Sequence, residues 1–125
     1  MTARKLTSYG LAIGIMLVTV PDSGRAENAE ENYQLYCVQC HGTQANGNGI
    51  NNTAGGLAVS PRNHTNAEEM SKLSNEDLRL AIAKGGDAVS KSELMPPWSG
   101  VLTNQEIDEM AVFLRELCKC QGKPE

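Results

Sequence analysis

Apolar residues recur at helical spacing in three parts of this chain, and no part shows the alternation that is typical of a strand. The first part, residues 28–40, is predicted to be a helix, and one face of it carries residues spaced four apart, which continue to the next residue: Ala29, Tyr33, Cys37 and His41. The second part runs from Ser74 to about Lys84, and the third begins at Thr103. The pattern therefore predicts an all-α fold with three main helices.

Two of these helices begin at motifs that satisfy free backbone N–H groups. Ser74-Asn-Glu-Asp77 resembles a capping box, with Asp at the fourth position, and Thr103-Asn-Gln-Glu106 is a second one. Gly85-Gly86 ends the helix that Ser74 begins. The apolar positions that we expect to form the core are Leu78, Ala81, Ile82, Ile107, Met110, Ala111, Leu114 and Leu117, with Phe113 beside them and Met70 in a short helical turn at 67–71.

Two long loops separate the predicted helices. Residues 42–65 are rich in Gly and Asn, and residues 87–102 contain the run Leu94-Met-Pro-Pro-Trp98. Loops of this length in a small domain tend to be functional or to wrap a ligand. The chain has only five aromatic residues but 12 glycines, and a chain so poor in large apolar side chains usually needs a cofactor, metal or disulfide to stabilise it.

The first 26 residues are predicted to be a cleaved signal peptide. A basic head at Arg4 and Lys5 precedes an apolar run over residues 11–20, and Gly24-Arg-Ala26 has small residues at the cleavage positions. The run is too short for the roughly 20 residues that span a bilayer, so a permanent anchor is the weaker interpretation. We therefore expect residues 27–125 to form one periplasmic domain without a membrane span.

The net charge argues against nucleic acid as a partner. The whole chain has 11 basic and 15 acidic residues, and residues 27–125 retain 8 and 14 of these, a net charge of −6. Such an acidic surface disfavours binding to nucleic acid and to anionic lipid, and it favours binding to redox proteins with basic docking patches.

Cys37-Val-Gln-Cys40-His41 is the motif that carries chemistry. C-x-x-C-H is the attachment pattern of haem c. Thiols three residues apart on a helix point the same way and can add to the two haem vinyl groups, while His41, one turn after Cys37, can ligate the iron. A thioredoxin-like redox pair is the first alternative, but no strand precedes the motif. Half of a zinc site is the second, but a second pair of ligands with zinc spacing is missing.

Met95 is the candidate for the second axial ligand. It lies in a loop that Pro96 and Pro97 stiffen. A stiff loop suits a ligand whose sulfur must keep the same distance from the iron in both oxidation states. A thioether ligand raises the reduction potential. The alternative is a core methionine, which is the usual role of this residue.

Together these motifs resemble the class I c-type cytochromes. The resemblance covers about residues 29–117 and rests on Tyr33, the Cys37–His41 motif followed by Gly42, Met95-Pro96-Pro97-Trp98, and a last helix with Phe113. It implies a cytochrome c-like fold around one haem, with His41 proximal and Met95 distal. It also implies that the first and last helices cross near Ala29, Tyr33, Phe113 and Leu114.

The resemblance does not settle the roles of several residues in the first loop. Many bacterial relatives carry Pro where this chain has Ile50, and in them a backbone carbonyl of this region accepts a hydrogen bond from the proximal histidine. Ile50 or a neighbour could supply that carbonyl to His41, but the sequence leaves open which residue does. His64 is expected to be an exposed loop residue rather than a ligand, and Arg62 could pair with a haem propionate.

Cys118 and Cys120 lie outside the family pattern. A bond between cysteines two apart would be strained, so we expect a local role, a disulfide-linked partner or, least of all, a thiolate ligand to iron.

The sequence therefore predicts a single-electron carrier that is not an enzyme and that passes electrons between respiratory redox proteins. The alternative is a haem-containing subunit, or a haem protein that binds a gas or other small ligand at an open or cysteine-ligated distal position. No paired carboxylates, nucleophile elbow or phosphate-binding loop offers a competing active site.

Overall fold

The computed structural model describes residues 23–125, with side chains from residue 28 onward. Within this part the chain forms helices and no strands, in the order α1 (Ser23–Tyr36), α2 (Val38–His41), α3 (Ile50–Thr53), α4 (Ala67–Ser71), α5 (Asn75–Lys84), the 3-10 helix η1 (Asp87–Val89) and α6 (Asn104–Cys118). The predicted all-α class is therefore confirmed. The predicted signal peptide, residues 1–26, lies almost entirely outside the described residues.

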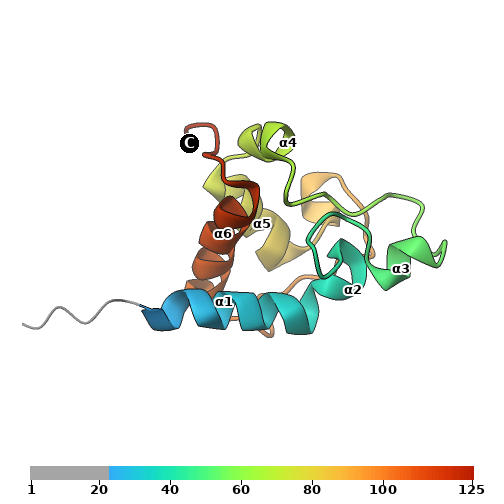
Figure 1. The fold of residues 1–125 in the computed structure, drawn as a ribbon, viewed down its shortest axis with the longest axis horizontal. Helices are drawn as coiled ribbons and strands as arrows, with labels where there is room; N and C mark the ends of the chain where they lie inside the picture. The colour runs from blue at the N-terminus through green and yellow to red at the C-terminus, as the bar shows by residue number, and fades with distance from the viewer. Residues whose placement is uncertain (1–22) are drawn as a thin grey trace, which may run out of the picture.

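Helices α1, α5 and α6 form the frame of the molecule. Figure 1 shows α1 lying along one edge, α6 rising from it, and α5 packed beside α6. At the α1–α6 crossing, Ala29, Tyr33 and Leu114 are buried, and the Tyr33 and Phe113 rings lie 5.6 Å apart. The crossing that the family resemblance implied is thus present.

The two capping boxes form as the sequence predicts. The Ser74 hydroxyl accepts from the Asp77 amide, while the Asp77 carboxylate accepts from the Ser74 amide at 2.8 Å. Thr103 and Glu106 make the same reciprocal pair at the start of α6. Each box satisfies N–H groups that the first turn of a helix leaves free.

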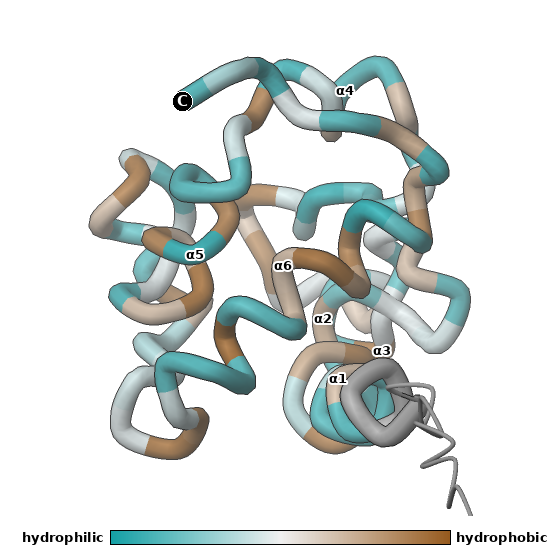
Figure 2. The backbone as a smooth tube through the Cα atoms, turned by 90° about the vertical axis from the view of Figure 1, so that its left-hand side faces the viewer, coloured by the Kyte–Doolittle hydropathy of each residue, from teal (hydrophilic) through white to brown (hydrophobic). Residues whose placement is uncertain are grey.

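The buried side chains follow the predicted periodicity. In Figure 2 the tube alternates between apolar and polar colours along α5 and α6, as expected for helices with one buried face. Met70 and Met110 are fully buried, as the sequence predicts. The rest of the main core is Tyr33, Ala45, Leu78, Ile82, Leu102, Ile107, Ala111, Leu114 and Cys118. Leu117 and Phe113 are half-buried at its edge.

The first predicted helix is interrupted at one residue. Cys37 has φ −107° and separates α1 from α2, although its N–H still donates to Tyr33 and its carbonyl still accepts from His41. The interruption turns the attachment motif relative to the long helix. The predicted loops also contain the short helices α3 and η1, which their sequence does not announce because neither has a side-chain cap.

No helix within residues 23–125 combines the length and apolar character needed to cross a bilayer.

Candidate functional site

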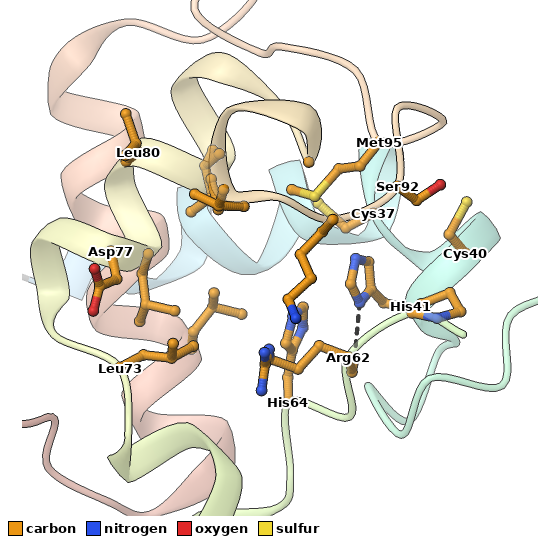
Figure 3. A pocket seen from close by; sticks show the side chains of 18 of the residues that line it. Cys37, Cys40, His41, Arg62, His64, Leu73, Asp77, Leu80, Ser92 and Met95 are labelled. Carbon is orange, nitrogen blue, oxygen red and sulfur yellow. Dashed lines mark hydrogen bonds between the residues drawn. The ribbon is translucent and has the colours of Figure 1, made fainter. Parts of the chain in front are cut away.

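A cavity of about 830 Å³ lies between the helices and the two long loops. It is lined from α1, α2, the segment 57–64, α5, the segment 86–98 and α6. Its size falls in the upper part of the roughly 300–1,000 Å³ range of ligand cavities. Figure 3 shows Cys37, Cys40, His41 and Met95 near one another at this cavity, and Leu73, Asp77 and Leu80 farther from them. The four residues that the sequence singled out therefore share one site.

Cys37 and Cys40 are unbonded and half-buried on the cavity wall. Burial raises the pKa of Cys37 to about 12, and the neighbouring Cys40 contributes to the shift. Cys37 is therefore a neutral thiol at physiological pH. The cysteines of thioredoxin-like redox pairs have lowered pKa values, so this environment disfavours that alternative.

His41 presents one nitrogen to the protein and keeps the other available. Its Nδ1 lies 3.0 Å from the carbonyl oxygen of Arg62, the contact drawn as a dashed line in Figure 3. Because a carbonyl can only accept, Nδ1 carries the proton and Nε2 has the lone pair. Burial lowers the pKa of His41, although the hydrogen bond to Arg62 opposes this shift. The ring is therefore neutral and held in the tautomer that ligates a metal through Nε2.

The carbonyl that accepts from His41 belongs to Arg62, and not to Ile50 or its neighbours, so the structure supplies the residue that the sequence left open. Ile50 is instead 63% exposed and begins α3. The segment before it folds back on the motif, with the Gly49 amide donating to the Cys40 carbonyl at 3.0 Å. A Cβ on Gly49 would collide with the backbone of Cys40, so this close approach requires glycine. The loop after α3 then brings the Arg62 carbonyl back to the His41 ring.

Met95 is held at the cavity by the backbone around it. Its carbonyl accepts from the Gly86 amide at 3.0 Å, and its own amide donates to Ser92 at 3.2 Å. Directly after the two prolines, the Trp98 amide donates to the Ile82 carbonyl at 3.0 Å, which ties the loop to the end of α5. The Met95 side chain is half-buried and lines the cavity.

His64 is buried, so the expectation of an exposed loop histidine is wrong. It is 8% exposed and lies at the cavity wall, with its ring stacked on that of His41 at a centroid distance of 4.1 Å. Burial holds the pKa of His64 well below its usual value, and the nearby His41 and Arg62 lower it further. Arg62 also lines the cavity, and its guanidinium lies 3.9 Å from the Glu69 carboxylate.

Cys118 and Cys120 form a disulfide with each other, which is a local role despite the short separation that predicts strain. Lys119 between them adopts a left-handed conformation, with φ 51°, and this brings the two Cα atoms to 5.2 Å, within the usual range for a disulfide. Neither sulfur lines the cavity, and in this bonded state neither is free to link a partner chain or to ligate iron.

The donor set fits a covalently attached haem. Two thiols three residues apart, an imidazole with an available Nε2 and a thioether all line one cavity. Residues 23–125 contain no group of three or more His, Cys, Asp or Glu side chains placed to hold a metal ion, which is what the zinc alternative would need.

Two contacts of the site were missed by sequence reasoning. The carbonyl of Arg62 lies 21 residues from His41, and the Tyr33 hydroxyl lies 31 residues from His64, which it contacts at 3.0 Å. No local motif marks either contact, because each arises where a loop of irregular path passes a helix. The sequence of the Pro61-Arg-Asn-His64 segment does not indicate that this loop folds back against His41 and Tyr33.

Comparisons with known proteins agree with a c-type cytochrome. Residues 24–114 match the model of the family described as cytochrome C oxidase, cbb3-type, subunit III. No curated protein matches the chain significantly.

Two solved structures are similar in fold. A c-type cytochrome, KustC0563, is 25% identical with a TM-score of 0.56, and the match covers 71% of this chain and 95% of that one. The second is the reducing HAO-like protein complex Kustc0457/Kustc0458 of Kuenenia stuttgartiensis, at 23% identity and a TM-score of 0.57. That match covers 73% of this chain and 41% of the chain in the complex, so this chain spans less than half of that relative.

Proposed function

Because this chain belongs to the family of the cbb3-type cytochrome c oxidase subunit III and is a small c-type cytochrome, we propose that it is a single-electron carrier with one haem c. The haem would supply the one-electron iron couple. Cys37 and Cys40 would attach it through two thioethers, and His41 and Met95 would be the axial ligands.

The observation that carries this proposal is the state of His41. Its Nδ1–H donates to the Arg62 carbonyl, and the second nitrogen remains available on a cavity that Cys37, Cys40 and Met95 also line. A ligating histidine almost always has such a partner, which orients the ring and raises its basicity. With both axial positions filled, small molecules would have little access to the iron, so we propose transfer of electrons rather than catalysis.

The remaining parts of the proposal concern the setting of this domain. We propose that residues 1–26 are cleaved on export and that residues 27–125 work in the periplasm. The net charge of −6 on residues 27–125 supports donors and acceptors with basic docking patches, whose association would weaken as salt rises.

Intact-mass analysis of the exported protein tests the attachment. The expected result is the mass of residues 27–125 plus one haem, and Cys37→Ser combined with Cys40→Ser should abolish the added mass. An exported wild-type chain without added mass would refute the proposal.

The ferric absorption spectrum tests the methionine. The thioether-to-iron charge-transfer band should be present in the wild type and absent in Met95→Ala. Met70→Leu is the matched control, because Met70 is fully buried in α4 and does not line the cavity. A band that survives Met95→Ala would remove Met95 from the ligand set.

The family description favours a second candidate, a haem subunit that stays docked on a larger oxidoreductase. Size-exclusion chromatography of the natively extracted protein distinguishes the two, since a free carrier elutes as a small protein and a docked subunit with its complex. Rapid binding of carbon monoxide by the reduced wild type would instead favour an open distal position.

A further inference from the structure

Two histidine rings lie face to face at the wall of the cavity. The His41 and His64 centroids are 4.1 Å apart, and their planes differ by 18°. Axial ligands approach a metal from opposite sides, so a ring stacked on His41 at this distance is not placed to be the second ligand. His64 therefore needs another explanation, and the two rings are close enough for one to restrict the movement of the other.

His64 is itself held firmly. Its Nδ1 shares a hydrogen bond with the Tyr33 hydroxyl at 3.0 Å, and its backbone amide donates to the Ala45 carbonyl at 2.8 Å. Tyr33 is 2% exposed and packs against Phe113 where α1 crosses α6. A continuous line of contacts thus joins the helix crossing to the imidazole of His41.

The hydrogen bond to Arg62 alone does not fully orient His41. A ring held through one nitrogen can still tilt about that contact, whereas a ring held there and pressed against a fixed flat surface cannot. His64 supplies that surface on one face of His41. An aliphatic residue would fill the same space, but it would leave the buried Tyr33 hydroxyl without its partner and present no flat face.

We propose that His64, anchored by Tyr33, is a positioning residue that sets the plane of the His41 imidazole and thereby tunes the haem that His41 would ligate. This inference rests on the proposed function, because it requires His41 to be the proximal ligand. Both rings are neutral, since burial lowers the pKa of each, so the stack involves no repulsion between charges.

The test compares three variants of the full-length exported holoprotein. His64→Leu removes the flat face, His64→Phe keeps it but loses the hydrogen bond, and Tyr33→Phe removes one oxygen and leaves His64 in place. The readouts are the hyperfine-shifted haem methyl resonances and g values of the ferric protein, which report the orientation of the axial imidazole, and the midpoint potential.

The largest shifts of the resonances, the g values and the potential are expected in His64→Leu, with smaller ones in His64→Phe and Tyr33→Phe. The control is Ile107→Val, which removes a methylene from the buried face of α6 at a residue that does not line the cavity. It should lower the melting temperature without changing the resonances, the g values or the potential.

Wild-type resonances, g values and potential in a haem-loaded His64→Leu protein would overturn the inference and leave the proposed function intact. If His64→Leu does not accumulate, unchanged readouts in Tyr33→Phe overturn it. A wild-type protein without covalent haem would instead refute the proposed function.

Discussion

Replacing Gly85 by alanine should loosen the loop that holds Met95. Gly85 ends α5 with φ +84° and ψ 175°, an extended positive-φ conformation that is almost confined to glycine and costs a residue with a Cβ roughly 1–3 kcal/mol. An added Cβ would also lie 2.6 Å from the Met95 carbonyl oxygen and 3.0 Å from the Pro97 nitrogen. Both neighbours are backbone atoms, so the loop itself must move to relieve the contact.

The magnitude of the effect has two parts. The backbone conformation accounts for about 1–3 kcal/mol, and overpacking of this kind typically costs about 1–3 kcal/mol more. We therefore expect Gly85→Ala to lower the free energy of unfolding by about 2–6 kcal/mol.

Gly55 offers a matched control for this substitution. It also has a positive φ, +78°, but no atom lies within 4 Å of the position that its Cβ would take. Gly55→Ala should therefore lose only the backbone part, about 1–2 kcal/mol. Gly55→Ala therefore shows the cost of a Cβ at a positive φ without a contact to the Met95 loop.

The assay is urea unfolding of the two haem-loaded variants, combined with the ferric charge-transfer band of the thioether ligand. Gly85→Ala should be the less stable and should weaken the band, while Gly55→Ala should retain it. Equal stabilities and an unchanged band in both variants would show that the Gly85 backbone does not constrain Met95.

Three further predictions concern the rest of the frame. Ser74→Ala removes the side-chain cap of α5 and should lower the free energy of unfolding by about 1 kcal/mol in urea titrations, with no change of slope. The pKa of Asp77 is lowered to about 2, mainly by the hydrogen bond from Lys123 and then by the Ser74 amide. Its folded pKa is depressed, so its contribution to stability is complete above about pH 4 and is lost as the pH falls toward 2. Asp77→Asn should therefore flatten the pH dependence of stability in that window, and an unchanged slope would contradict this. Replacing Cys118 and Cys120 together by serine opens a loop of only three residues, so the loss should not exceed about 1.6 kcal/mol by the loop-closure relation, and a loss of 4 kcal/mol or more would assign the disulfide a larger role.

Local sequence determined the helices and the chemistry that they carry. The capping boxes at Ser74 and Thr103, the stop at Gly85 and the apolar spacing of α6 are all set by residues within one or two turns, so each was predictable. The attachment motif is likewise local, since two thiols and an imidazole within five residues share one short helical segment. The two prolines after Met95 marked it as the candidate second ligand, and the family resemblance supported that role.

Tertiary structure alone decided what surrounds those residues. Arg62 accepts from His41, and Tyr33 holds His64, across 21 and 31 residues of chain, and neither contact has a periodic or local signature. His64 is polar and lies in a loop, which favours exposure, yet packing against His41 and Tyr33 buries it. The path of a long loop depends on the summed contacts of its whole length with distant helices, and for this reason the sequence indicates which residues carry the chemistry but not which neighbours orient them.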